Sequence, residues 1–561
     1  MNPSRNPNLE SGNDLQEQVT IFQAPSNDHP ASTLEVSVEQ AIDRLNANQP
    51  RHALSILNHL AGREPRVSNL EYLRAIALAR CGDSNNAIQT LESLLAKSPT
   101  HSKARVLLAQ LQPKVTGRES APHSSRTGKR LDPTQLDWKG LRFLDPTGRV
   151  FEYEGEFYRA VYPSAEPRVR NLFRSGIVEK LVERKLLVET EITDLEVPGY
   201  ALVLHHRRFP FDVRAPEWNR SLLRDAALGV LDLNLELLRD EMGTIDYHAS
   251  NVLQQNGCIP SWLDFGSICP LTELNGEPRL WGIAEFLQHF VHPLALHAKH
   301  ADLGPVARTL LKDGGIPSKA FHALTGSNLK LPVQTREAWL SALRNWLAGL
   351  KFPPLGSTWE QYHKDHRLAE GLPTPDQRRQ SRIYSILEKL NPRRVVDLGC
   401  NAGYFSYLAC RLGAEVCAVD FDEGALERLY RIAREQQPTP KITVALRDLI
   451  KRNSTLSGDL AMGLALTHHL SISRNYPFSW IAEMLASYTT DALITEFMPY
   501  GLGGNHPVPD PLPDHYRLEN FRESFTKHFR EVEVIDYPLA PTQSKRILVV
   551  CRGKIAGSKG P

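Results

Sequence analysis

A chain of 561 residues is long enough for roughly three or four domains of ordinary size. Its hydrophobic content of 41% and charged content of 23% are typical of a globular protein. A net charge of +2 gives no basic excess for binding phosphate backbones, so we expect no nucleic-acid partner. No uncharged apolar run reaches the roughly eighteen residues that a membrane span requires, so none is predicted.

The first 33 residues are polar and rich in Asn, Pro, Ser and Glu. They show no periodicity and no apolar segment of a secretory signal, so residues 1–33 are predicted to be a disordered leader. The seven cysteines are odd in number and form no C-x-x-C pair. This pattern is typical of reduced thiols, and we therefore expect a cytoplasmic protein.

Residues 34–112 contain small residues and prolines that recur with a period of 34. The recurring positions are Ala41, Ala75 and Ala109; Ala53 and Ala87; and Pro65 and Pro99. This period resembles that of the tetratricopeptide repeat (TPR), in which small residues let paired helices approach and a proline ends the second helix. The resemblance implies a helical scaffold that binds a protein partner; a helical cap packed on its own chain is the alternative. A Ser-, Gly- and Lys/Arg-containing linker is expected over 113–134.

Residues 135–350 carry the pattern of an α+β domain. The stretch 149–162 predicts two strands joined at Gly155, 199–208 predicts a further strand, and a helical stretch then leads to residue 243. Next come "IDYHASNVL" and "LDFGS", which contain Asp246, Asn251 and Asp264. Their spacing resembles the catalytic loop and metal-binding turn of kinase-fold small-molecule and sugar phosphotransferases. In that family Asp246 would accept the proton of the substrate hydroxyl, and Asn251 and Asp264 would hold Mg²⁺.

The chain departs from the kinase pattern in two respects. It has no G-x-G-x-x-G loop over the phosphates and no V-A-I-K lysine, for which Arg159 is the nearest cation, with Glu179 or Glu183 as a candidate partner. We therefore predict a degenerate kinase-like scaffold, with an active phosphotransferase as the alternative. The nearby histidines His289, His292, His297 and His300 lack a cysteine or acid to complete a ligand set, and no metal site is predicted there.

The clearest motif is "VVDLGCNAGYFSYLA", residues 395–409. It predicts a strand over 393–397, a glycine-bearing turn and a helix to about Leu412, followed by a strand over 414–420 that ends in Asp420. Such a βαβ unit faces a cofactor with its turn and places an acid for ribose hydroxyls.

Three features distinguish this unit from a dinucleotide site. The turn reads D-x-G-x-N-x-G rather than G-x-G-x-x-G, and Asp397 would repel a pyrophosphate but suit a cationic cofactor. The last two predicted strands, 531–537 and 546–552, are joined by a connection of eight residues. Because parallel strands need a longer crossover, these two must form an antiparallel hairpin.

With these features, residues 357–552 resemble the class I S-adenosylmethionine (SAM)-dependent methyltransferases, whose α/β Rossmann-like sheet ends in an antiparallel strand. A methyltransferase domain is therefore predicted over 351–556. Within that class these residues resemble the bacterial group related to the rhizobial host-specificity nodulation methyltransferase, as "DLAMGLALTHHLSIS", "ALITEFMP" and "LENFRESFTKHF" also indicate. The kinase-like stretch resembles the segment before the methyltransferase in that group. The resemblance therefore covers residues 140–552 and implies SAM as the cofactor.

The resemblance also implies a role for each matching residue. Gly399, Asn401 and Gly403 would let the backbone approach the methionine part of SAM, and Asp397 would hold its amino group. The ribose hydroxyls would bind Asp420, while the adenine would lie against Asp448 and Leu449.

Candidate catalytic residues follow the fourth and fifth predicted strands. His468 and His469 either activate or position the acceptor, or bond locally and shape the pocket, and Glu496 is a candidate to orient them or the acceptor. Trp359 and Tyr362, and the Pro- and Gly-rich segment 499–516, are expected to cover the site. That segment also contains His506, Asp510, Asp514 and His515, which are predicted to be solvated turn residues rather than Mg²⁺ ligands.

Together these patterns predict a multidomain methyltransferase that acts on an unknown small-molecule or glycan acceptor. A bifunctional kinase–methyltransferase that modifies a glycan terminus is one alternative. A non-enzymatic adaptor is the other.

Overall fold

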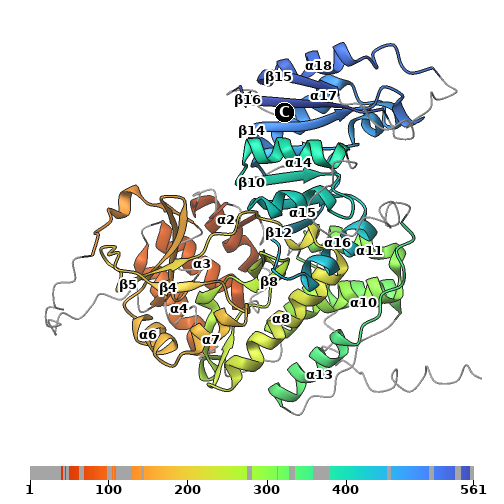
Figure 1. The fold of residues 1–561 in the computed structure, drawn as a ribbon. Helices are drawn as coiled ribbons and strands as arrows, with labels where there is room; N and C mark the ends of the chain where they lie inside the picture. The colour runs from red at the N-terminus through yellow and green to blue at the C-terminus, as the bar shows by residue number, and fades with distance from the viewer. Residues whose placement is uncertain are drawn as a thin grey trace, which may run out of the picture.

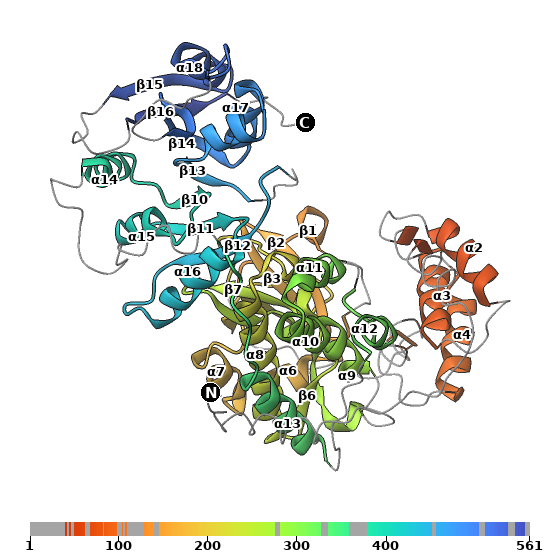
Figure 2. The same ribbon diagram turned by 90° about the vertical axis from the view of Figure 1, so that its right-hand side faces the viewer.

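We analysed a computed structural model of the chain (Figures 1 and 2). The structure describes residues 40–41, 44–45, 50–61, 68–81, 83–97, 104, 107–108, 111, 128–139, 145–274, 281–312, 314–326, 335–357, 378–450, 456–503, 511–536 and 545–555. No helix in these ranges is long and apolar enough to cross a membrane. The seven cysteines all lie in these ranges, and each is a free thiol.

The N-terminal region is helical and has a core of its own. Its described helices are α2 (Pro50–Ala61), α3 (Ser68–Arg80) and α4 (Ser84–Lys97). The side chains of Ala41, Ala75, Ala53 and Ala87 are fully buried in this core, as expected where small residues let helices approach closely. Pro65, Pro99 and Ala109 lie outside the described residues. The helices are confirmed, while their assignment as TPR units stays a prediction.

The middle region begins with a five-stranded antiparallel sheet in the order β1-β2-β3-β5-β4. The strands are β1 (Asp137–Trp138), β2 (Gly148–Tyr153), β3 (Glu156–Val161), β4 (Thr190–Ile192) and β5 (Leu202–His206). The hairpin predicted at Gly155 is confirmed, and this glycine has a φ of +82° that suits its turn. Two helices, α6 (Glu166–Arg174) and α7 (Ile177–Glu183), separate β3 from β4.

The rest of the middle region is mainly helical. Its helices are α8 (Arg220–Leu238), α9 (Trp281–Phe286), α10 (His292–Lys299), α11 (Gly304–Leu311), α12 (Ser318–Thr325) and α13 (Arg336–Ala348). Its strands are β6 (Met242–Thr244), β7 (Val252–Gln255), β8 (Ile259–Trp262) and β9 (Ile268–Pro270), which pair as β6 with β9 and β7 with β8. The end of the expected linker also packs here: Leu131 is buried, and its amide donates to the carbonyl of Glu196 (2.8 Å). The region therefore begins before residue 135.

The C-terminal region is built on a seven-stranded sheet in the order β12-β11-β10-β13-β14-β16-β15. The strands are β10 (Arg394–Leu398), β11 (Glu415–Asp420), β12 (Ile442–Leu446), β13 (Gly458–Gly463), β14 (Thr489–Phe497), β15 (Phe529–Asp536) and β16 (Ile547–Lys554). The helices are α14 (Arg378–Leu390), α15 (Tyr404–Arg411), α16 (Glu423–Glu435), α17 (Phe478–Ser487) and α18 (Leu518–Thr526). Only β16 is antiparallel to β14, and it pairs with β15 as the predicted hairpin. The Rossmann-like sheet with an antiparallel last strand is thus confirmed.

Two glutamates of α16 cap the first turn of α8, which belongs to the middle region. Glu427 accepts hydrogen bonds from Asn219 Nδ2 (2.7 Å) and from the Ser221 amide (2.8 Å), and Glu423 accepts one from the Arg220 amide (3.0 Å). Carboxylates at a helix N-terminus satisfy free amides and interact favourably with the helix dipole. The cap of this helix is therefore supplied by a segment about two hundred residues later in the chain.

The middle region also covers the open edge of the seven-stranded sheet. The side-chain amide of Gln254 donates to the carbonyl of Val444 (2.8 Å) and accepts from its amide (3.0 Å), as a neighbouring strand would. The Cys258 amide adds a bond to the carbonyl of Ile442 (3.1 Å). The two regions share one hydrophobic core, and both views show α16 and β12 beside α8 and the β7–β8 hairpin (Figures 1 and 2). Edge strand β12 is consequently protected by the middle region.

We expect Glu427→Ala to lower the free energy of unfolding by about 1–2 kcal/mol, because the side-chain amide of Asn219 and the backbone amide of Ser221 lose their acceptor. Thermal unfolding followed by circular dichroism measures the effect. Glu435→Ala, at the exposed end of the same helix, is the control and should change little. Equal effects of the two substitutions would contradict the capping role.

Candidate active site

The turn after β10 is held in a conformation that glycine favours. Gly399, Asn401 and Gly403 have φ values of +71°, +52° and +78°. The amides of Gly399 (2.8 Å) and Cys400 (3.1 Å) donate to the carbonyl of Val419 at the end of β11, which fixes the turn to the neighbouring strand. An L residue other than glycine or asparagine is strained at such angles, and this explains the residue types of the motif.

Two buried acids flank this turn. Asp397 at the end of β10 is 3% exposed and accepts a hydrogen bond from Ser406 Oγ (2.6 Å). Burial raises the pKa of Asp397 to about 6, although the hydrogen bond from Ser406 opposes that rise. Asp420 accepts hydrogen bonds from the amides of Asn401 (2.7 Å) and Asp422 (2.9 Å), and burial raises its pKa as well. A cation placed between them would stabilise both carboxylates in the charged form.

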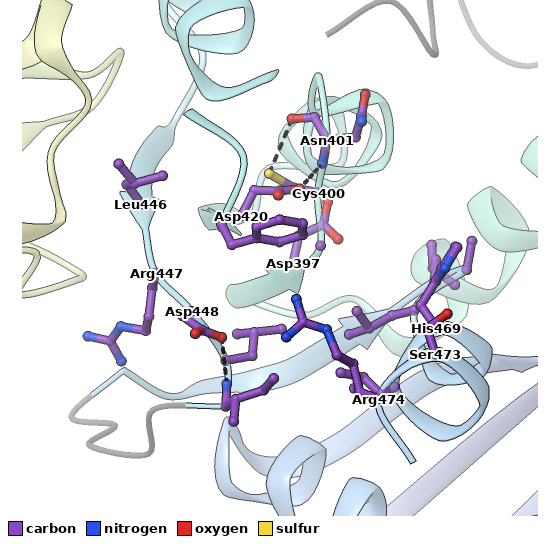
Figure 3. Close-up of a pocket in the computed structure, with 18 of the residues that line it drawn as sticks. Asp397, Cys400, Asn401, Asp420, Leu446, Arg447, Asp448, His469, Ser473 and Arg474 are labelled. Carbon is purple, nitrogen blue, oxygen red and sulfur yellow. Dashed lines mark hydrogen bonds between the residues drawn. The ribbon is translucent and has the colours of Figure 1, made fainter. Parts of the chain in front are cut away.

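The turn and the acids open into a cavity of about 1200 Å³ at the carboxyl edge of the sheet. Six of the predicted cofactor-binding residues line it: Asp397, Gly399, Asn401, Asp420, Asp448 and Leu449. Figure 3 shows Asp397, Cys400, Asn401 and Asp420 together, with Asp448 on the loop after β12. Gly403 is not among the lining residues; it starts helix α15.

His468 and His469 also line the cavity, where they begin a π-helical turn (His469–Ser473) beyond β13. Their rings lie 4.1 Å apart between centroids. Burial, His469 and Arg546 together lower the pKa of His468 to about 3, and burial lowers that of His469. Both imidazoles are therefore neutral at pH 7, and His468 holds a proton too weakly to serve as an efficient base. Of the roles considered for His468, this geometry favours positioning and shaping the pocket.

Glu496 lies beneath the cavity rather than in its lining. Its side chain is fully buried in β14 and forms a bidentate ion pair with Arg379 (both 2.7 Å) and a further one with Arg546 (3.1 Å). Burial alone would raise the pKa of Glu496, but the two arginines hold it at about 2. Because Arg379 and Arg546 both line the cavity, Glu496 holds two cations in its wall.

Sequence reasoning missed several lining residues. Phe421, directly after Asp420, is 62% exposed, which is unusual for a large apolar side chain and places a ring beside the acid. The feature of the sequence that could have indicated it is the phenylalanine directly after the acid in "AVDFD". Arg379, Arg474 and Arg546 come from three separate segments, and no local pattern marks them.

The middle region supplies part of the same cavity. Its contribution comes from Pro216, Glu217, Pro305, Arg308, Thr309 and Lys312. Glu217 forms a bidentate ion pair with Arg447 (2.7 and 2.8 Å), the residue before Asp448, and Arg308 pairs with Glu423 (2.5 Å). The predicted division into two regions therefore does not divide the site.

Much of the predicted cover lies outside the described residues, including Trp359, Tyr362, His506 and Asp510. The adjoining residues do reach the site. Ser357 Oγ donates to Asp422 (2.6 Å) at the start of α16, and Gly501 and Leu502 line the cavity. Asp514 and His515 are described, and no metal-binding group of His, Cys, Asp or Glu is found in the described part of the chain.

The kinase-like residues meet in a different arrangement from the one expected. Asn251 and Asp264 are close, since the Leu263 amide donates to the Asn251 carbonyl (2.8 Å). Asp264, however, forms an ion pair with Arg159 of β3 (3.3 Å) and accepts from the Gly266 amide (3.1 Å). Arg159 is buried and also pairs with Asp145. The suggested partners Glu179 and Glu183 are exposed, so that part of the prediction is wrong.

The histidines of the middle region have different partners and surroundings. His289 Nε2 lies 3.1 Å from Nδ1 of His248, which is two residues after Asp246 in the sequence. His292 bonds to the carbonyl of Ile316 (2.6 Å), and burial lowers the pKa of His297 to about 3. These are the contacts of core histidines.

Comparisons with known proteins give one related sequence and several distant structures. No protein-family model matches the chain. The nodulation protein NoeA of Rhizobium meliloti (strain 1021) is 28% identical over 415 residues, which cover 64% of this chain and 84% of that protein.

Among solved structures, the magnesium protoporphyrin IX methyltransferase of Synechocystis PCC 6803 with bound SAM matches with a TM-score of 0.26 and 18% identity, over 35% of this chain and 92% of that one. The bifunctional kinase-methyltransferase WbdD matches with a TM-score of 0.25 and 19% identity, over 35% and 46% of the two chains. TehB from Haemophilus influenzae matches with a TM-score of 0.25 and 18% identity, over 31% and 62%. With TM-scores this low, these structures support no conclusion about the function of this chain.

We expect Gly403→Ala to destabilise the C-terminal region by about 2–4 kcal/mol, because the new Cβ would overlap the Leu429 side chain at a positive φ. Gly413→Ala is the control, since Gly413 has a φ of +96° but no atom within 4 Å of the added carbon. It should lose only about 1 kcal/mol. Urea unfolding compares the two, and equal losses would show that space at Gly403 does not matter.

Proposed function

We propose that the C-terminal region is a SAM-dependent methyltransferase whose acceptor is a glycan or another small molecule. The observation that carries the proposal is the cavity at the carboxyl edge of the sheet, where a glycine turn meets Asp397 and Asp420, both with pKa values raised by burial. Such a pocket suits a cationic nucleoside cofactor and disfavours a pyrophosphate. Its volume of about 1200 Å³ leaves room for an acceptor of modest size beside the cofactor.

The lining residues suggest how SAM is held. Asp397 binds the methionine ammonium group, and Asp420 accepts hydrogen bonds from the ribose hydroxyls. Asp448 receives the adenine amino group, while Leu449 and the exposed ring of Phe421 pack against the base. Gly399 and Asn401 keep the backbone close to the cofactor, and Gly403 maintains the turn without lining the pocket.

When bound, SAM supplies an electrophilic methyl group on a sulfonium ion. The protein's part is then to orient the acceptor in line with that methyl group and to exclude water, which provides high effective molarity. His468 and His469 border the cavity as neutral imidazoles and position the acceptor. Glu496 fixes two cations, Arg379 and Arg546, in the wall of the same cavity.

Binding of S-adenosylhomocysteine should weaken about tenfold between pH 7 and pH 5. The pKa of Asp397 is raised to about 6, so below that pH the carboxyl group must release a proton before it can accept the ligand's ammonium group. Titration calorimetry at the two pH values measures this. Asp397→Asn should bind more weakly at pH 7 and lose the pH dependence, whereas Asp491→Asn, on an exposed aspartate, should behave like the unaltered protein. If Asp397→Asn still bound S-adenosylhomocysteine more weakly at pH 5 than at pH 7, a group other than Asp397 would be responsible for the pH dependence.

A bifunctional kinase–methyltransferase is less well supported. The five-stranded sheet, the β7–β8 hairpin and the Asp264 turn support the proposal of a kinase-like scaffold. Arg159, however, forms an ion pair with Asp264, the carboxylate that would have to hold Mg²⁺. We propose that Asp246, Asn251 and Asp264 are remnants with a structural role and that no phosphoryl transfer takes place.

Millimolar Mg-ATP should therefore leave the thermal unfolding midpoint unchanged, because binding would require breaking the Arg159–Asp264 pair. Asp264→Asn should lower the midpoint without ligand, since it leaves the buried Arg159 with less compensation. A midpoint that rises with Mg-ATP, and no longer rises in Asp264→Asn, would instead favour an active kinase.

The N-terminal helices are proposed to bind a protein partner in the manner of TPR arrays, and we place the protein in the cytoplasm. A purely non-enzymatic adaptor remains the third function, with a direct test. The adaptor function would be supported if the folded protein gave no heat of binding in calorimetry with either SAM or S-adenosylhomocysteine.

A further inference from the structure

The cavity is lined by charged residues of both signs. The ends of β10 and β11 and the loop after β12 place Asp397, Asp420 and Asp448 on one side. Other lining residues are cations: Arg379, Arg546, Arg474 and Lys312. Figure 3 shows His469, Ser473 and Arg474 across from the acids, with the Arg474 side chain extending into the space between. The acids suit the cationic part of SAM, which leaves lining cations available to another ligand.

These cations differ in their partners. Arg379 and Arg546 both form ion pairs with Glu496. Lys312 and Arg474 are exposed and pair with no acid in the described chain. By contrast, two neighbouring cations have acids of their own, Arg308 with Glu423 and Arg447 with Glu217. Lys312 and Arg474 are thus lining cations for which the described chain supplies no acid.

The cofactor itself accounts for one of these charges. SAM carries a carboxylate, and Arg379 is placed for it, since its guanidinium lies 4.8 Å above the ring of Phe405 in the first turn of α15, next to the glycine turn. Lys312, which follows α11, and Arg474, which follows the π-helical turn, remain. They come from different regions of the chain and border one cavity.

We propose, on the basis of the methyltransferase function above, that the acceptor is an anion with a carboxylate or phosphate group, and that Lys312 and Arg474 bind it where the two regions meet. Arginine offers a planar fork to either group, and lysine supplies a mobile point charge. The middle region thereby becomes part of the acceptor site.

An anionic acceptor also fits the neighbouring histidines. The acceptor oxygen attacks the methyl carbon, a C–O bond forms, the C–S bond breaks, and its electron pair stays on sulfur. The sulfonium ion becomes a neutral thioether, and the acceptor loses one negative charge: a carboxylate becomes a neutral methyl ester and a phosphate monoester dianion becomes a singly charged methyl diester. No proton has to be removed. Burial and its neighbours hold His468 neutral with a pKa of about 3, and an oxygen that arrives ionised needs no base there.

Three sugars that differ in one group test the proposal on the full chain: D-glucuronate, glucose 1-phosphate and neutral D-glucose. Each is titrated by calorimetry into the complex with S-adenosylhomocysteine. We expect one of the two anions to bind about tenfold more tightly than glucose, and the one that does so identifies the group as carboxylate or phosphate. The double variant Lys312→Ala/Arg474→Ala should lose that preference, while Arg522→Ala/Lys527→Ala, on the exposed surface of α18, should retain it.

The possible results separate the two proposals. If the unaltered protein does not bind S-adenosylhomocysteine, the methyltransferase function itself fails. If it binds the cofactor product but neither anion more tightly than glucose, or if the double variant keeps the preference, the anionic acceptor site is overturned. Binding of S-adenosylhomocysteine is measured in every variant, so that loss of the acceptor site is distinguished from loss of the fold.

Discussion

The contact between α16 and α8 is the constraint on which the rest of the molecule depends. Glu423 and Glu427 cap the first turn of α8, and Gln254 and Cys258 complete the hydrogen bonds of β12. Neither region satisfies these backbone groups alone, and an unsatisfied buried amide is costly. The middle region and the Rossmann-like sheet consequently share one core, and the cavity at the end of the sheet has walls from both.

This joint construction gives the middle region a part in the site of its neighbour. The buried Arg159 ties Asp264 to β3 and so stabilises the scaffold from which α11 projects. Arg308 at the cavity then pairs with Glu423, the same residue that caps α8. The middle region thus supports a wall of the neighbouring site.

Much of the fold was accessible from the sequence because its signals are local. The turn at Gly399–Gly403 and the acid Asp420 lie within about twenty residues, and the eight-residue connection forced the β15–β16 hairpin. The charge network was not accessible. Arg379 reaches Glu496 across 117 residues and Glu217 reaches Arg447 across 230, and no periodicity marks either partner. Glu496 was noticed for its position at the end of a strand, but its partners define what it does.

The place of β16 within the sheet has a consequence for biosynthesis. This strand, Ile547–Lys554, follows β15 in the sequence, yet it lies between β14 and β15. Until it leaves the ribosome, the nascent chain exposes unpaired edges on both of those strands, which are templates for aggregation. The sheet is therefore completed only after residue 554 has been translated, and a chain ending before residue 547 would lack the strand that joins β15 to β14.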